Sequence, residues 1–282
     1  MRNFRIYLFL AFVAFMSAFI YSCAEESTTE SQQYQNFTKD QLNELQKQLG
    51  VDENTENSYA LAGADCGNTT QGCLLLQAAK KDTVLIPGTN CYAEATYDLY
   101  RCITSTSGNY IITHVFNNFS ATPIPSVGCD SIINSWVALA DAGNFSELSN
   151  QLDIFHSIVS EQIEIKYNQA FFNNTFFRTY FNCNSFNTLL FSEFYVSNCY
   201  QWCFKYIIRD GKPQIDYRKN SCGESCCKRT TAYCWSTSQN MMISSNPNVV
   251  QIGTCVADNP GSPCQAGYIA LGNCNHTCFP KK

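Results

Sequence analysis

In several stretches of the chain, apolar positions alternate with polar ones, which is the period of a β-strand. The clearest stretch is CYQWCFKYII, which RDGKP and QIDYR follow, and its Asp-Gly step predicts a hairpin. One face of the first strand carries Tyr200, Trp202, Phe204, Tyr206 and Ile208. We interpret this aromatic face as the core side of a half-buried sheet, with a sugar-stacking platform as the alternative.

Two further hairpins are predicted by the same alternation. Residues 91–103 alternate, TSTSGN forms a polar turn, and residues 110–116 return. Nearer the C-terminus, KRTTAYCW is followed by STSQN and MMI. Because strands lie on both sides of residues 203–222, we expect one continuous antiparallel sheet rather than two independent domains.

Helical spacing interrupts the strands in one region. Asp130 is expected to cap a short helix that closes near Gly143, and Asn144 with Glu147 opens a longer one. The apolar stripe of the longer helix is Leu148, Leu152, Phe155, Val159 and Ile163, and its opposite, polar side carries Asp153, Ser157, Glu161 and Glu164. The chain is therefore expected to have an α+β fold: a disulfide-rich, mainly antiparallel β-sheet with one or two packed helices.

The N-terminus reads as a targeting segment. Arg2 and Arg5 precede an apolar run, residues 6–20, that is shorter than the roughly 20 residues of a membrane-spanning helix. After it, the sequence IYSC resembles the lipobox of bacterial lipoproteins, which implies that Cys23 is lipidated and becomes the first residue. A second cut, after Ala24, implies simple secretion, and an uncleaved anchor is the third alternative. We therefore expect residues 1–22 to be a signal peptide.

Residues 23–60 are rich in acidic side chains and poor in apolar ones, which is typical of a solvated tether. One short helix is expected within it, over residues 39–49, where Thr38 and Gln41 make a capping box before a leucine stripe. Such a short helix is marginal unless it docks on another element. The globular α+β core is expected over residues 61–220, with a cysteine-dense β and loop extension over residues 221–282.

The chain holds 17 cysteines, of which 16 remain after Cys23 is set aside. An even number in an exported chain indicates a disulfide framework, whose pairing the sequence leaves open. The cysteines expected to pair are Cys66, Cys73, Cys91, Cys102, Cys129, Cys183, Cys199, Cys203, Cys222, Cys226, Cys227, Cys234, Cys255, Cys264, Cys274 and Cys278. Cys199 and Cys203 lie about 13 Å apart along one strand, so each needs a partner on a neighbouring element.

Composition narrows the class of protein. Charged residues make up 15% of the chain, so Asn, Ser, Thr and Gln must supply most of the polar surface. The net charge of −5 lacks the positive excess that is typical of nucleic-acid-binding proteins. A basic cluster over residues 205–229 includes Lys205, Arg209, Lys212 and Arg218, which are candidates for binding an anionic glycan or partner. Ordinary solvated hairpin charges are the alternative. Asn-x-Ser/Thr sequons, the acceptor motif for N-glycosylation, favour a eukaryotic secretory origin. They begin at Asn36, Asn68, Asn118, Asn144, Asn173 and Asn275.

No catalytic motif is found in the sequence. The nearest grouping is Asp153, His156 and Ser160, which share one face of the longer helix and which we interpret as a solvated polar face. Three Cys-x-x-x-Cys pairs, with His276 inside the last, raise structural zinc, but an oxidising compartment favours disulfides. We therefore expect no cofactor and no metal.

These observations predict an exported protein, anchored at the cell surface or secreted, with a non-catalytic binding or structural role. Its expected partners are the membrane, through the lipid, and a surface glycan or protein. Two alternatives stay open: a secreted hydrolase whose site is assembled from distant residues, and a secreted disulfide-stapled inhibitor or effector. A His–carboxylate contact in the structure would favour the hydrolase. The oligomeric state is left undetermined.

Overall fold

The computed structural model describes residues 37–49, 73–106, 109–223, 225–255, 264–272, 274 and 276–281. The predicted signal peptide, the lipobox-like sequence and most of the acidic tether lie outside these residues. Within them, no helix is long and apolar enough to cross a membrane.

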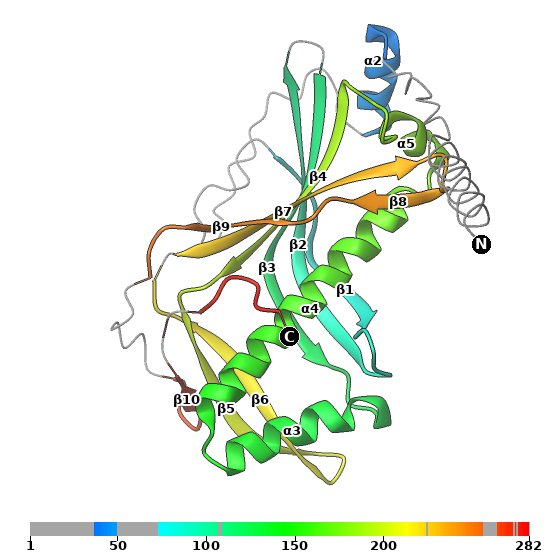
Figure 1. Cartoon of the computed structure of the whole chain (residues 1–282). Helices are drawn as coiled ribbons and strands as arrows, with labels where there is room; N and C mark the ends of the chain where they lie inside the picture. Colours follow the sequence, from blue (N-terminus) through cyan, green and yellow to red (C-terminus); the bar gives the residue numbers. More distant parts are fainter. Residues whose placement is uncertain are drawn as a thin grey trace, which may run out of the picture. The chain divides into compact units, whose positions relative to one another are not determined.

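The described chain is an α+β fold dominated by antiparallel strands, as predicted (Figure 1). The helices are α2 (Lys39–Gln48), the 3-10 turn η1 (Val127–Cys129), α3 (Asp130–Asp141), α4 (Phe145–Phe171) and α5 (Thr175–Tyr180). The strands are β1 (Cys73–Leu85), β2 (Tyr92–Thr106), β3 (Asn109–Pro123), β4 (Thr188–Ser197), β5 (Tyr200–Arg209), β6 (Lys212–Ser221), β7 (Cys226–Ser236), β8 (Met241–Ser244), β9 (Asn248–Ile252) and β10 (Ile269–Leu271). The cap of α3 is Cys129, so Asp130 lies in the first turn instead of capping it.

The larger sheet has the strand order β1-β2-β3-β4-β7-β8, and β9 also pairs with β7. All its pairs are antiparallel except β3 with β4, which are parallel. The parallel pair follows from the connection, because α3, α4 and α5 all lie between these two strands and return the chain to the same end of the sheet. The β2–β3 and β7–β8 hairpins confirm two of the sequence predictions.

The third predicted hairpin, β5–β6, is confirmed, but it is not part of the larger sheet. It pairs only with β10 in a separate three-stranded sheet, so the prediction of one continuous sheet is wrong. The reason is that β4 already has β3 on one edge and β7 on the other, which leaves no edge for β5. Both sheets nevertheless belong to one unit of the chain.

Helix α4 is the centre of the molecule's main core. It packs against strands β1 to β4 of the larger sheet and against β10 of the smaller one (Figure 1). Every residue of its predicted apolar stripe is buried, and the largest exposed fraction among them is 5%, at Phe155. Trp202 and Phe204 of the smaller sheet belong to the same buried cluster. The helix is therefore covered on two sides, by two different sheets.

Helix α2 forms as predicted, with the Thr38–Gln41 capping box in place. Its leucine stripe packs into a second buried cluster with Phe171, Phe172 and Tyr233, and Leu45 is fully buried. This docking supplies the stabilisation that so short a helix lacks in isolation. Residues 37–49 thus belong to the folded unit, although they were predicted to lie in the tether.

Seven disulfides cross-link the described residues. The pairs are Cys73–Cys102, Cys91–Cys129, Cys183–Cys234, Cys199–Cys255, Cys203–Cys264, Cys222–Cys274 and Cys227–Cys278. Cys199, just before β5, and Cys203, within it, have different partners, as their separation required. Of the other two predicted cysteines, Cys226 is buried and Cys66 lies outside the described residues. So many disulfides place the protein among exported chains.

Candidate functional site

The polar side of α4 is buried, and the prediction of a solvated face is wrong for four of its residues. Asp153 is 8% exposed and His156 is 7% exposed, while Ser160 and Glu164 are almost completely inaccessible. The cause is β5 of the second sheet, β7 of the larger sheet and the C-terminal segment, which together cover this side of the helix. Burial of carboxylates requires hydrogen-bonding partners, and two clusters on α4 provide them.

The first cluster, called here the Asp153 cluster, joins three segments of the chain. Asp153 Oδ1 accepts hydrogen bonds from the Tyr200 hydroxyl and, at 2.7 Å, from Trp202 Nε1, both on β5. Asp153 Oδ2 lies 2.7 Å from Nδ1 of His276 in the C-terminal segment. The His276 ring also stacks on Tyr200, with 4.0 Å between ring centroids. The carboxylate thus ties α4, β5 and the C-terminal segment together.

A lysine lies against this cluster. Lys219 of β6 places its ammonium group 4.2 Å from the ring centre of Tyr200 and 5.0 Å from that of Trp202. Burial lowers the pKa of Lys219 to about 8, and the nearby Asp153 carboxylate only partly opposes this shift. A hollow of about 20 Å³ lies beside Lys219 and Asp153, which is room for one water molecule.

The His276–Asp153 contact is the feature that would favour a hydrolase. However, Nε2 of His276 is buried and has no hydrogen-bond partner among the described residues. The hydroxyls of Ser160 and Ser197, which line the same hollow, already bond to Ser157 O and Ser225 O. A catalytic imidazole needs a nucleophile or a substrate within hydrogen-bonding reach of its free nitrogen. This geometry fits a structural role for the contact, which holds the C-terminal segment against α4.

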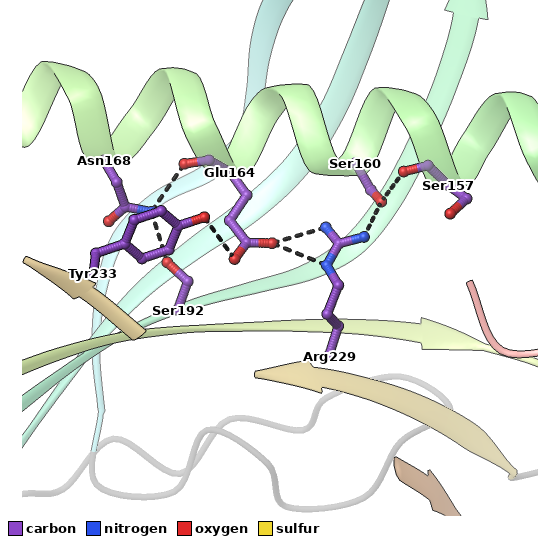
Figure 2. Close-up of polar contacts among 7 residues, drawn as sticks. All are labelled: Ser157, Ser160, Glu164, Asn168, Ser192, Arg229 and Tyr233. Carbon is purple, nitrogen blue, oxygen red and sulfur yellow. Dashed lines mark hydrogen bonds and ion pairs between the residues drawn. The ribbon is translucent and has the colours of Figure 1, made fainter. Parts of the chain in front are cut away.

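The second cluster, called here the Glu164 cluster, lies farther along the same side of α4 (Figure 2). Glu164 Oε2 accepts hydrogen bonds from Arg229 Nη2 at 2.8 Å and Nε at 3.1 Å, while Oε1 accepts one from the Tyr233 hydroxyl at 3.0 Å. Arg229 Nη1 donates to Ser160 Oγ at 3.2 Å. Burial next to the Glu164 carboxylate raises the pKa of Tyr233, so its hydroxyl stays a donor.

Strand β7 brings the partners of Glu164 to the helix. Arg229 and Tyr233 are four residues apart on β7, so both side chains point to the same face of the sheet, toward α4 (Figure 2). The Arg229 guanidinium also lies 4.5 Å from the ring centre of Phe279. One turn farther along α4, Asn168 donates to Ser192 Oγ at 2.7 Å and completes the polar row. Arg229 is therefore fixed on several sides before any ligand binds.

A hollow of about 280 Å³, called here the Arg229 hollow, opens beside the Glu164 cluster. Its lining residues are Ser157, Glu161, Glu164, Ile165, Arg229, Thr231, Tyr233, Ser244, Ser245, Asn246, Pro247, Val249, Phe279 and Lys281. The rim residues Glu161, Asn246 and Lys281 are exposed, so the hollow is open to solvent. Its volume is near the lower end of small-molecule sites.

The structure divides the candidate binding residues of the β5–β6 hairpin. Tyr200, Trp202 and Phe204 are buried, which confirms the core interpretation for these three residues and excludes the continuous sugar-stacking platform. The interpretation is wrong for the far end of the strand, where Ile208 is 73% exposed and Tyr206 also faces solvent. Tyr206 is 46% exposed and its hydroxyl donates to Asp141. The structure therefore assembles no aromatic surface here.

Three of the four basic candidates form ion pairs within the chain. Lys205 and Arg218 both pair with Asp216, at 3.7 and 3.8 Å, and Lys212 pairs with Asp130 at 2.9 Å. Arg209 lies at the end of β5, next to the turn of the hairpin. Exposed pairs of this kind contribute at most about 1 kcal/mol each. Because Lys205 and Arg218 share one carboxylate, part of the positive charge of this hairpin stays unbalanced.

Sequence reasoning missed Glu164, Arg229 and Tyr233 as one site. Glu164 was assigned to a polar helix face and Arg229 to a basic hairpin, and 65 residues separate the two. The sequence signal for this site was Glu164 itself, a carboxylate on the same side of α4 as Asp153 and Ser160. The metal alternative loses most of its ligands, because Cys199, Cys203, Cys222, Cys274 and Cys278 form disulfides.

Comparisons of the chain with protein-family models, with curated proteins and with solved structures gave no match.

Proposed function

We propose that this chain is an exported, non-catalytic binding protein and that a small polar ligand occupies the Arg229 hollow. The observation that carries the proposal is the combination of a solvent-open hollow of about 280 Å³ with a charged pair already fixed at its base. Rigid polar groups in a concave site are what a binding site needs, because little entropy is lost when the ligand arrives.

The lining of the hollow favours a neutral, polyhydroxylated ligand such as a small saccharide. The charges of Arg229 and Glu164 neutralise each other, so the base of the hollow holds no unpaired charge for an ionic ligand. Hydroxyl and amide groups of Ser157, Ser244 and Asn246 provide donors and acceptors around it. This composition also agrees with the expectation of a glycan partner.

The hydrolase alternative rests on the Asp153–His276 contact, and it can be tested separately. A catalytic His276 predicts that His276→Ala abolishes a hydrolytic activity while binding in the Arg229 hollow persists. A structural His276 predicts loss of stability in the same variant, with no activity to lose.

The proposal also includes how the protein is held outside the cell. The sequence supports either a lipid on Cys23, which anchors the chain, or release after cleavage at Ala24. The intact mass of protein recovered from its host, without reduction and after thiol alkylation, separates the two forms. A diacylglyceryl group on Cys23 indicates the anchor, and an N-terminus at Glu25 indicates release.

The binding proposal is tested by calorimetric titration of the purified, oxidised protein with monosaccharides, disaccharides, free amino acids and inorganic phosphate. We expect the neutral sugars to bind and the charged compounds not to bind. Ser244→Trp fills the hollow from its exposed rim and should abolish binding. The matched control is Thr237→Trp, an exposed change in the same β7–β8 hairpin outside the hollow, which should leave binding intact. Absence of binding by every compound, or equal binding by both variants, would refute the proposal.

A further inference from the structure

Three of the chain's six Asn-x-Ser/Thr sequons lie among the described residues, and all three have the same exposure pattern. The acceptor asparagines Asn118, Asn144 and Asn173 are exposed. The hydroxyl residues two positions later, Ser120, Ser146 and Thr175, are exposed as well. Both parts of each sequon therefore face solvent in the folded protein.

Buried asparagines provide the contrast. Asn117, Asn168, Asn187 and Asn198 are all at most 9% exposed, and none of them begins a sequon. The neighbours Asn117 and Asn118 show the difference most directly, since only the outward-facing one carries the motif. The sequons thus occur where the fold has room for a bulky polar attachment.

Local backbone structure explains how each acceptor is held outside. Asn118 has a φ of +50° beside an irregularity in the β2–β3 pairing, while its neighbour Phe119 points into the core. Asn144 follows Gly143, which has a φ of +67°, and its side chain makes no capping bond to α4. Asn173 lies in the turn between α4 and α5. Turns and irregularities leave the acceptor amide accessible from solvent.

We propose that the exported protein carries N-linked oligosaccharides on Asn118, Asn144 and Asn173. The donor is an oligosaccharide linked to a polyisoprenyl diphosphate. In the transfer, a bond forms between Asn Nδ2 and the anomeric carbon, the bond from that carbon to the diphosphate oxygen breaks, and Nδ2 loses one proton. The remaining N–H of Asn118 can still donate to Asp98, as it does at 2.5 Å in the unmodified side chain.

The modification has two consequences for the rest of the molecule. None of the three acceptors lines the Arg229 hollow, so glycosylation and ligand binding can succeed or fail independently. N-linked glycans on this chain also favour the released form that begins at Glu25, because the lipobox is a bacterial signal. They would add hydrophilic surface to a chain in which only 15% of residues are charged.

The test is peptide mass spectrometry of the protein recovered from its native host, after treatment in ¹⁸O-water with an amidase that releases N-glycans. Glycosylated asparagines become ¹⁸O-labelled aspartates, and we expect the label at all three positions. Unmodified asparagine at the three positions would overturn the proposal.

Variants made in a eukaryotic secretory host assign each glycan to its sequon. Ser120→Ala, Ser146→Ala and Thr175→Ala change exposed hydroxyls, and each should remove one glycan and its mass. The matched controls Ser120→Thr, Ser146→Thr and Thr175→Ser keep the sequons and should keep all three glycans. A glycan that remains after its hydroxyl residue is replaced by alanine would contradict the assignment.

Discussion

Asp153 and Glu164 are two carboxylates on the same helix, eleven residues apart and therefore on nearly the same side of it. Both are buried, and both accept hydrogen bonds from a tyrosine and from a basic or aromatic side chain. They differ in the space around them. The hollow at Asp153 holds about 20 Å³, and the hollow at Glu164 holds about 280 Å³.

The two clusters therefore meet different requirements of a functional site: one has a suggestive contact, and the other has space for a ligand. The Asp153 cluster contains the contact that most resembles a catalytic dyad, yet the free nitrogen of its histidine is buried. The Glu164 cluster has no such motif, but it is adjacent to open space with fixed polar groups. A site is therefore better inferred from room for a ligand than from the similarity of one contact to a known motif.

The largest expected effect comes from breaking the ion pair of the Glu164 cluster. Arg229→Met leaves the Glu164 carboxylate buried without its cation, and we expect the free energy of unfolding to fall by about 3–5 kcal/mol. The double variant Arg229→Met/Glu164→Gln should recover part of that loss, because the unpaired charge is gone. Urea unfolding with disulfides intact measures both. A single variant within about 1 kcal/mol of the original chain would show that solvent, rather than Arg229, stabilises this carboxylate.

A smaller loss is expected when the Asp153 cluster is altered. Asp153→Asn keeps the side chain's size but replaces one acceptor oxygen with a donor, so Nδ1–H of His276 loses its acceptor. We expect a loss of about 2–3 kcal/mol, because a buried donor is left without an acceptor and the hollow beside Asp153 has room for only one water molecule. Glu161→Gln, an exposed change on the same helix, serves as the control and should cost less than about 0.5 kcal/mol. Equal effects of the two variants would mean that solvent reaches the Asp153 cluster and replaces the lost hydrogen bond.

The pKa of Lys219 provides a second test of how far solvent is excluded from the Asp153 cluster. Its pKa of about 8 in the folded chain is below its ordinary value of 10.5, so between these pH values the unfolded chain holds more protons than the folded one. Stability should therefore rise with pH over this window, by about 2 kcal/mol once partial solvent exposure is allowed for. The difference in unfolding free energy between the original chain and Lys219→Met isolates the effect. A difference that does not change from pH 8 to 10.5 would place Lys219 in solvent.

The smallest and most direct comparison uses two tyrosines. Tyr200→Phe and Tyr233→Phe each remove one hydroxyl that donates to a buried carboxylate. We expect Tyr200→Phe to cost about 1–2 kcal/mol and Tyr233→Phe less than about 1 kcal/mol, because the hollow of about 280 Å³ at Tyr233 holds more water to replace the lost hydroxyl than the hollow of about 20 Å³ at Tyr200. Thermal unfolding of both variants checks the order. The reverse order would contradict the contrast between the Asp153 cluster, beside a small hollow, and the Glu164 cluster, beside a large one.

Local sequence signals predicted the elements of the fold well. The Asp-Gly turn between β5 and β6 has φ values of +52° at Asp210 and +74° at Gly211, which is the turn that this dipeptide favours. The Thr38–Gln41 box and the apolar stripe of α4 also formed as expected. Each of these signals acts within a few residues, so the sequence alone contains it.

What the sequence did not indicate depends on contacts between distant residues. Periodicity identified the apolar side of α4, but it could not show that the second sheet covers Asp153 and that β7 of the larger sheet covers Glu164. The site also required β7 to pair with β4, which brings Arg229 to the helix from 65 positions away. Patterns within one element carry no information about such a neighbour.

Four of the disulfides follow one order along the chain. Cys199, Cys203, Cys222 and Cys227 pair, in that sequence, with Cys255, Cys264, Cys274 and Cys278. None of these bonds can close until residue 255 or later has left the ribosome and reached the oxidising compartment, whereas Cys73–Cys102 and Cys91–Cys129 need only the first 129 residues. Once the chain is complete, these eight cysteines have 105 possible pairings among them. Maturation of this protein should therefore depend on a disulfide isomerase, and a chain truncated before residue 255 should accumulate mispaired intermediates.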